Sequence, residues 1–334
     1  MSLIEISDLH KVYKQAIRKP GLVGAIRHLI KSEYREEHAV RGIDLTIEAG
    51  ESIGYIGPNG AGKSTSIKIM TGILKPTRGE IQVGGLNPFA DRMRYASRIG
   101  VVFGHRSQLW WDIPILESFK LLKDIYRIPA STFHSNMNMF ADLLGLGEFL
   151  HLTSRKLSLG QRMRADICAA FLHDPKVVFL DEPTIGLDIA VKERIRTFIR
   201  EVNHEKDVTI ILTTHDLTDI EQICKRLIII DHGKIIYDGT IERIKDKFAR
   251  TRTIHVTLGQ EGTPIVNSIS ECLPDVQVTN IEGVKLSLTF DRFKYTAGDL
   301  LKELLRNHDI VDFHIDEPNI EEIIKRVYGH SLTL

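Results

Sequence analysis

The chain has 334 residues, which is long enough for one large domain and a second, smaller one. Lysine and arginine together number 44, as do aspartate and glutamate, so the formal charge is zero and excludes a global field that would attract nucleic acid or an anionic membrane. The three cysteines, Cys168, Cys224 and Cys272, lie far apart, which excludes a metal-ligand spacing and favours small buried residues in a reducing compartment.

No segment of the sequence predicts a membrane anchor. Residues 1–6 alternate as in a β-strand and lack the basic start and long apolar core of a signal peptide. No apolar run approaches the roughly 20 residues that a transmembrane helix needs. If a membrane is involved, we therefore expect another chain to span it.

A glycine-rich loop follows a strand that we predict at Ser52–Ile56. The loop reads G-P-N-G-A-G-K-S-T and fits the pattern G-x-x-x-x-G-K-[ST] between a strand and a helix. Its glycines let backbone N–H groups point at phosphate, while Lys63 adds a cation and Ser64 can ligate magnesium. The helix predicted at Thr65–Ile73 directs its positive end to the same place. The predicted nucleotide-binding residues of this loop are Asn59, Gly60, Ala61, Gly62, Lys63, Ser64 and Thr65.

Two carboxylates, Asp181 and Glu182, follow the apolar run Val177–Leu180. Ligands of open α/β sheets bind at the C-terminal ends of such strands. Asp181 can hold the magnesium shell, and Glu182 can orient and deprotonate an attacking water. Taken alone, the pair could also be a strand entering a polar loop, but the phosphate loop favours the catalytic interpretation.

The segment Leu157-Ser158-Leu159-Gly160-Gln161 precedes a helix predicted at Gln161–Leu172. With the two motifs above it closely resembles the ATP-binding cassette (ABC) family, whose signature is usually L-S-G-G-Q, so Leu159 is a departure. The resemblance covers residues 3 to about 243. It implies that Ser158, Gly160 and Gln161 meet the γ-phosphate held by an opposite subunit, and a serine with free N–H groups at a helix start suits an anion. An ordinary serine N-cap is the alternative interpretation.

The same resemblance implies roles for three more residues. Tyr13 lies where the family has an aromatic side chain that stacks on adenine. Asp188 belongs to a segment like the family's D-loop and is implied at the dimer contact. His215, which follows a strand predicted at Val208–Leu212, is implied to bridge the γ-phosphate and Glu182.

His105 and Gln108 are alternatives for one further role. In the family, a glutamine opens the loop to the helical subdomain, where it binds magnesium or its water and links the nucleotide to the membrane partner. Counting from Glu117 reaches His105, and Gln108 stands three residues later. Because magnesium prefers oxygen ligands, we expect His105 to act through a bound water or to leave the role to Gln108.

An extra segment, Arg18–Glu37, separates Tyr13 from a strand predicted at Val40–Ile47. Apolar residues at helical spacing predict a helix over Leu22–Ile30 whose other side is basic. This helix could face lipid headgroups or a membrane partner, or its apolar face could pack on its own domain. With residues 106–112 and the C-terminal part, the segment resembles a branch of ABC-2-type, daunorubicin-resistance-like export ATPases.

The chain beyond residue 245 predicts a βαββαβ order with an added helix, as in a ferredoxin-like unit. The predicted strands are Thr253–Leu258, Val276–Ile281, Val284–Phe290 and Val311–Ile315, and the predicted helices are Pro264–Leu273, Ala297–Arg306 and Ile320–Val327.

The alternation of strands and helices predicts an α/β fold, followed by a small α+β domain. The resemblance implies that the first part is a P-loop ABC-type nucleotide-binding domain with a mixed sheet and a helical subdomain. We expect the domains at residues 1–245 and 246–334, with an insertion at about 18–37 and the helical subdomain at about 106–172. The resemblance implies an ATP-hydrolysing transporter subunit that uses ATP and Mg²⁺ and drives export. It implies a nucleotide-sandwich dimer beneath integral membrane permease subunits, peripheral on the cytoplasmic face of the membrane, with no nucleic acid as partner. The alternative is a soluble ABC-type ATPase of translation or DNA repair, although such proteins usually carry two cassettes or a long coiled-coil insertion.

Overall fold

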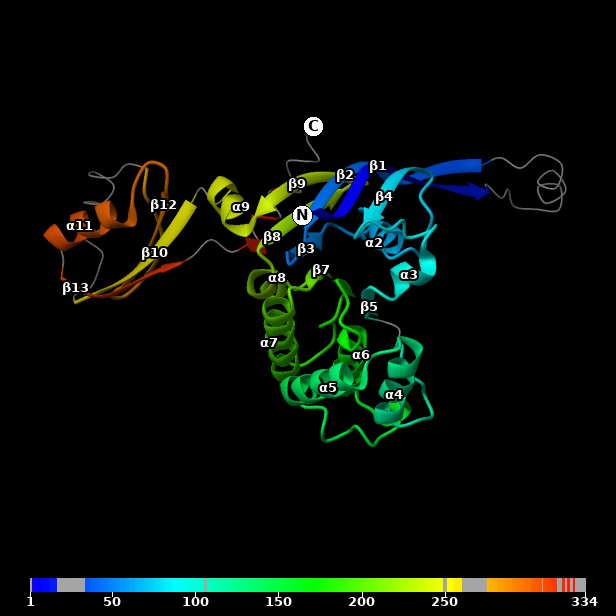
Figure 1. Cartoon of the computed structure of the whole chain (residues 1–334). Coiled ribbons are helices and arrows are strands. Elements are labelled where there is room, and N and C mark those ends of the chain that lie inside the picture. The colour runs from blue at the N-terminus through cyan, green and yellow to red at the C-terminus, as the bar shows by residue number, and fades with distance from the viewer. Residues whose placement is uncertain are drawn as a thin grey trace, which may run out of the picture. The chain divides into compact units, whose positions relative to one another are not determined.

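The computed structural model describes residues 2–16, 34–104, 107–248, 251–259, 275–307, 309–316, 320–321, 323–324 and 327. These residues fall into two compact units, Met1–Gly239 and Thr240–Leu334. Figure 1 shows both, with α/β layers in the first and a small sheet with a helix in the second. Within the described part of the chain, no helix has the length and apolar character needed to cross a bilayer.

A six-stranded sheet forms the centre of the first unit, with the strand order β5-β6-β7-β3-β8-β9. Its first five strands pair in parallel, and their apolar runs are buried on both faces, as parallel sheets require. His232 and Gly233 join the last two strands with positive φ, which suits a two-residue hairpin turn. The strands are β3 (Ser52–Ile56), β5 (Ile99–Phe103), β6 (Val177–Asp181), β7 (Thr209–Thr213), β8 (Arg226–Asp231) and β9 (Lys234–Thr240).

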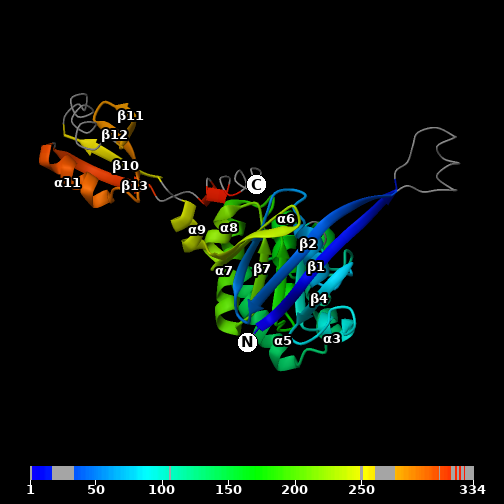
Figure 2. The same cartoon turned by 90° about the horizontal axis from the view of Figure 1, so that it is seen from above.

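An antiparallel layer covers the other side of the core, with the order β2-β1-β4. β1 (Ser2–Ala16) and β2 (Tyr34–Glu48) form a long ribbon that continues past β4 (Arg78–Val83), as Figure 2 shows. β2 begins before the strand predicted at Val40–Ile47, because residues 34–39 also belong to it, where Tyr34 pairs with Ala16 and Glu37 with Tyr13. The predicted helix Leu22–Ile30 lies outside the described residues.

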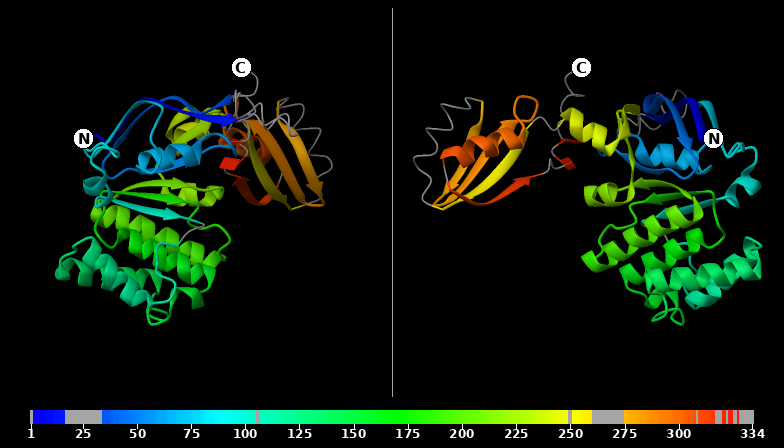
Figure 3. Two further views of the ribbon diagram at one scale, coloured as in Figure 1. Left: turned by 90° about the vertical axis from the view of Figure 1, so that its right-hand side faces the viewer. Right: turned by 60° about the vertical axis from the view of Figure 1, so that its left-hand side comes forward.

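Helices occupy two layers of the first unit. α2 (Lys63–Met70) buries Ile67, Ile69 and Met70 in a core shared with both sheets. The remaining helices lie on the opposite face of the six-stranded sheet or at its margin, as the left view of Figure 3 shows. They are α3 (Arg92–Ala96), α4 (Ile115–Ile125), α5 (Ala130–Leu144), the 3₁₀ turn Ser154–Lys156, α6 (Leu159–Phe171), α7 (Ile189–Lys206) and α8 (Leu217–Ile223).

Aromatic side chains from α5, α6 and α7 pack against one another. The ring of Phe198 on α7 makes edge-to-face contacts with Phe140 on α5 and Phe171 on α6, each with 5.2 Å between ring centroids. Such pairs are worth about 0.5–1.5 kcal/mol beyond their buried area. These contacts hold the C-terminal end of α6 against α7.

The second unit contains a four-stranded antiparallel sheet with the order β11-β12-β10-β13. This is the strand order of the split βαβ arrangement, as the sequence pattern predicts. The predicted helix Pro264–Leu273 lies outside the described residues, and Ile320–Val327 is described only in part. The elements are α9 (Ile241–Phe248), β10 (Thr251–Leu258), β11 (Gln277–Glu282), β12 (Lys285–Asp291), α11 (Ala297–Asn307) and β13 (Ile310–Asp316).

Candidate active site

The loop between β3 and α2 is built around glycines that no other residue could replace. A Cβ on Gly57 would lie 2.2 Å from the carbonyl oxygen of Ile230, and one on Gly62 would lie 2.3 Å from that of Ala39. Gly62 also has a φ of 105°, which side chains disfavour. The loop therefore wraps tightly and leaves the first N–H groups of α2 without partners inside the helix, an arrangement suited to phosphate.

Lys63 begins α2 and reaches back over the loop. Its Nζ donates to the carbonyl oxygens of Gly57 at 2.6 Å and Pro58 at 3.1 Å. Burial lowers the pKa of Lys63, while the nearby Glu182 and Asp181 carboxylates oppose that shift. The ammonium group is thus held at the mouth of a cradle of backbone N–H groups, where it can pair with phosphate oxygens.

The two carboxylates at the end of β6 have different surroundings. Asp181 accepts a 2.5 Å hydrogen bond from Oγ1 of Thr213 on the neighbouring β7. Glu182 has a φ of 55°, in the left-handed region that side chains rarely adopt, and its N–H donates to the carbonyl of Thr213 at 2.9 Å. Burial raises the pKa of Glu182, an effect that His215 partly offsets. Such a strained, buried carboxylate is common at functional sites.

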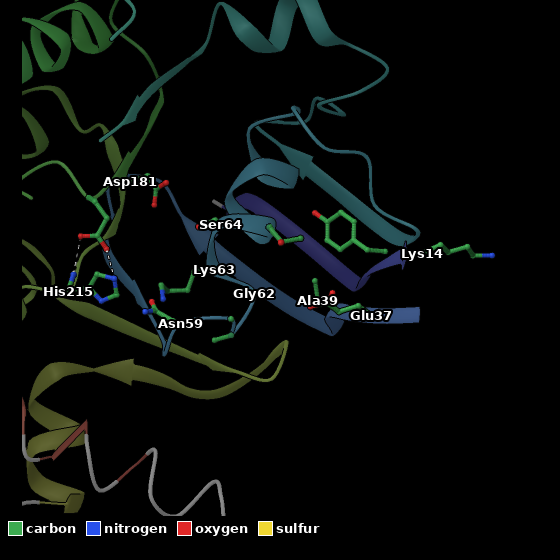
Figure 4. A pocket seen from close by; sticks show the side chains of 14 residues that line it. Lys14, Glu37, Ala39, Asn59, Gly62, Lys63, Ser64, Asp181 and His215 are labelled. Carbon is green, nitrogen blue, oxygen red and sulfur yellow. Dashed lines mark hydrogen bonds and ion pairs between the residues drawn. The ribbon is translucent and has the colours of Figure 1, made fainter. Parts of the chain in front are cut away.

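His215 contacts Glu182 in two ways, shown by the dashed lines of Figure 4. Its backbone N–H donates to Oε2 at 3.3 Å, and its Nε2 lies 3.3 Å from Oε1. The histidine ring is exposed, whereas the glutamate is mostly buried. The loop after β7 therefore fixes the orientation of the carboxylate that follows β6.

These residues line one pocket of about 610 Å³. Sequence reasoning missed three of its residues, Lys14, Glu37 and Ala39, which lie on the β1 and β2 side in Figure 4. The pairing of Tyr13 with Glu37 brings them there, and the polar sequence of residues 34–38 carries no local signal of that pairing. The pocket is lined by Tyr13, Lys14, Glu37, Ala39, Asn59, Gly60, Ala61, Gly62, Lys63, Ser64, Thr65, Asp181, Glu182 and His215.

The predicted signature and D-loop residues do not line this pocket. Ser158 is exposed and is the N-cap of α6, where its Oγ accepts from the N–H of Gln161 at 3.2 Å. The Gln161 side chain accepts in return from the N–H of Ser158 at 3.0 Å, which completes a capping box. Gly160 lies on the same turn, and Asp188 caps α7 by accepting from the N–H of Val191 at 2.9 Å. These four residues thus lie apart from the pocket within one chain.

Gln108 faces α6 rather than the pocket. Its Nε2 donates to the carbonyl oxygen of Asp166 at 2.9 Å, and its backbone N–H donates to Asp166 Oδ1 at 2.9 Å. Ser107 Oγ donates to the same carboxylate, whose pKa is raised to about 6 by burial. His105, the other candidate for this role, lies outside the described residues.

A buried network that sequence reasoning did not identify supports the two loops that carry Glu182 and His215. Asp219 on α8 accepts from Thr184 Oγ1 at 2.5 Å and from Thr214 Oγ1 at 2.9 Å. It also accepts from Arg196 Nε on α7 at 2.7 Å. Thr184 follows Glu182 closely and Thr214 precedes His215, so one carboxylate ties both loops to two helices.

Known proteins match this chain over most of its length. A family model described as ABC transporter matches residues 40–185. The linearmycin resistance ATP-binding protein LnrL of Bacillus subtilis (strain 168) is 28% identical over 324 residues, which are 91% of this chain and 97% of LnrL. The ABC transporter ATP-binding protein NatA of the same organism is 31% identical over 206 residues, 62% of this chain and 83% of NatA.

Solved structures share the fold. The ATP-binding cassette MJ0796, whose dimer was solved with ADP and Pi bound, has a TM-score of 0.58 and 24% identity, over 71% of this chain and 98% of MJ0796. Other relatives besides NatA are named as ABC transporter or import ATP-binding proteins, which favours a transporter ATPase over an ATPase of translation or DNA repair. A phosphate loop, a carboxylate pair and relatives that match along most of their length agree, and the chain belongs to the ABC transporter ATP-binding proteins, which are ATPases.

Proposed function

We propose that this subunit binds Mg²⁺-ATP in the pocket beside Lys63 and hydrolyses it with Glu182 as the general base. The observation that carries the proposal is the convergence of Lys63, Asp181, Glu182 and His215 on one pocket. Phosphate would take the N–H groups of the loop and the Lys63 ammonium. Tyr13, which is partly exposed at the pocket's edge, offers a ring on which adenine can stack.

The donor set suits magnesium. Ser64 and Asp181 present a hydroxyl and a carboxylate, the hard oxygen ligands that this ion prefers. When bound, the ion would neutralise charge on the phosphates. We propose that these two residues hold it and that Gln108 joins only after releasing Asp166, because both its amide and its N–H are engaged there.

Glu182 is suited to accept a proton from water. Its raised pKa brings the carboxylate nearer to the range in which a general base works best. The His215 contacts hold it in place, and the histidine ring remains exposed on the side where a γ-phosphate would lie. His215 therefore acts in this proposal as a positioning residue that also senses the phosphate.

The exposed signature residues are proposed to complete the pocket of a second copy. Ser158, Gly160, Gln161 and Asp188 carry the polar groups of two helix starts, yet none lines its own chain's pocket. A helix start favours a phosphate. A nucleotide bound to one chain would thus join two chains. The MJ0796 cassette, solved with ADP and Pi bound, is a dimer.

We further propose that the dimer works beneath separate integral membrane permease subunits, at the cytoplasmic face of the membrane. The proposal rests on family membership together with the finding that no described helix could span a bilayer. An export role is proposed because LnrL, which matches along 97% of its length, is named for resistance to linearmycin. Residues 246–334 are proposed as a separate accessory domain, near the division between the compact units.

Replacement of Glu182 by glutamine tests the assignment. The change keeps size and hydrogen bonding but removes the base, so Glu182→Gln should bind ATP, form a dimer on size-exclusion chromatography and lose turnover by about 10²-fold or more. Glu117→Gln, at an exposed helix position paired with Lys120, is the matched control and should behave as wild type. Normal turnover in Glu182→Gln would contradict the role of this residue.

A further inference from the structure

The outer edge of the C-terminal sheet is unusual for an edge strand. β13 ends the strand order, and no described strand pairs with its second edge. Val311 is 68% exposed and Phe313 is 49% exposed. Edge strands that carry apolar side chains and no pairing partner are ready templates for another strand.

The backbone of Phe313 points to this open edge. Its N–H donates to Oδ1 of the neighbouring Asp312 at 2.8 Å instead of to β10. In an antiparallel strand the N–H and C=O of one residue point to the same side, and alternate residues face opposite sides. Phe313 and Ile315 therefore offer their backbone groups outward, and the Asp312 side chain accepts from one of them, the N–H of Phe313.

Two copies of β13 are complementary in sequence when they are aligned antiparallel with Phe313 at the centre. In that register Phe313 faces Phe313 of a second copy, while Asp312 faces His314 and Val311 faces Ile315. Asp312 and His314 lie two residues apart and therefore on one face, so the two-fold symmetry creates two acid–histidine pairs. A shift of the register by two residues would place Asp312 opposite Asp316 or opposite Asp312 of the second copy, and Phe313 would no longer face Phe313. The match of opposite charges and of aromatic rings is therefore specific for this centre.

We propose that the C-terminal units of two copies pair through β13, antiparallel about Phe313, to form a continuous eight-stranded sheet. This contact goes beyond the proposed nucleotide-sandwich dimer, because it involves neither the pocket nor Ser158 and does not require ATP. Phe313 of the two copies would form a hydrogen-bonded pair, with the Asp312 carboxylate released to the partner's His314. His314 also lies 3.5 Å from Asp316 of its own strand, so acidic groups flank its ring.

Cysteine cross-linking of the nucleotide-free, full-length protein tests the register. Opposed residues of a hydrogen-bonded pair have Cα atoms about 5.5 Å apart, within the range of a disulfide. Phe313→Cys should therefore give disulfide-linked dimers at a rate about tenfold or more above that of Phe293→Cys, since pairing raises the local concentration. Phe293 is 67% exposed in the same unit but lies between β12 and α11, which makes it a control for exposure alone.

Charge reversal separates pairing from a folding defect. In the Phe313→Cys background, Asp312→Lys should abolish the excess cross-linking, because it places a cation opposite the partner's His314. Adding His314→Asp should restore it, since opposite charges then face each other again. Equal cross-linking of Phe313→Cys and Phe293→Cys, or no recovery in the charge-swapped variant, would overturn the proposal.

Discussion

Replacement of Asp219 by asparagine tests whether the buried network supports the active site. Asp219 is 0% exposed and accepts hydrogen bonds from Thr184, Thr214 and Arg196. The Arg196 side chain is only 7% exposed, so water cannot solvate its charge when the carboxylate is lost. Asparagine keeps the size of the side chain and part of its accepting capacity but removes the negative charge.

The expected loss of stability follows from what remains around Arg196. Removal of one partner of a buried ion pair costs about 3–5 kcal/mol. Asp216 still lies 3.2 Å from Nη2 of Arg196, and asparagine still accepts one hydrogen bond. We therefore expect Asp219→Asn to lower the free energy of unfolding by about 2–3 kcal/mol. At about 2–4 °C per kcal/mol for a domain of this size, the melting temperature should fall by about 5–10 °C.

The measurement is thermal and urea-induced unfolding of wild type, Asp219→Asn and a matched control. Asp238→Asn removes a carboxylate from the more exposed pair with Arg226, so it should cost no more than about 1 kcal/mol. The turnover number should also fall in Asp219→Asn, because Thr184 and Thr214 lie close to Glu182 and His215, which we propose take part in hydrolysis. Equal stability of the two variants would refute the reasoning.

Three further predictions concern the loops and helix starts. Gly62→Ala should abolish ATP binding in a fluorescence titration while the chain still folds, because its Cβ would meet the Ala39 carbonyl at a φ of 105°. The raised pKa of Asp166 means that its contribution to stability is complete below the unfolded value and is lost as pH rises through about 6. Wild type should therefore lose stability between about pH 4.5 and pH 7.5, whereas Asp166→Asn should not. The free energy of unfolding of Asp166→Asn relative to wild type should rise by about 2 kcal/mol over this range in urea unfolding, and a pH-independent difference would contradict this. Ser158→Ala should lower the free energy of unfolding by about 1 kcal/mol, as expected for the loss of a helix cap. Ser158→Asp should retain most of that stability, because aspartate also caps helices, but it should impair ATP-dependent dimer formation on size-exclusion chromatography.

The parts of the fold that the sequence predicts well are those with a strong local signal. The strands of the parallel sheet are short apolar runs because both of their faces are buried, and β6 was predicted to within one residue of its end at Asp181. The phosphate loop combines glycines, a lysine and a hydroxyl in one segment, so its place between β3 and α2 is also evident. The fold class is confirmed by the solved cassettes.

The features that escaped prediction depend on distant partners or on polar patterning. Residues 34–38 of β2 are exposed, so they lack the apolar alternation that marks a strand, and only the pairing with β1 reveals them. Glu37 enters the pocket through that pairing alone. Asp219 resembles any surface aspartate in the sequence, because its burial depends on Arg196 and two threonines from other loops. A contact of this kind is set by the topology and has no local signal.

The separation of Ser158 from the pocket of its own chain has a genetic consequence. If each site takes Lys63 from one copy and Ser158 from the other, a chain defective in Lys63 and a chain defective in Ser158 can complement each other. A mixed dimer of these two chains would contain one site with both defects and one site with neither. Two alleles that are each inactive alone should therefore restore partial transport when expressed together, whereas two alleles with defects in the same loop should not.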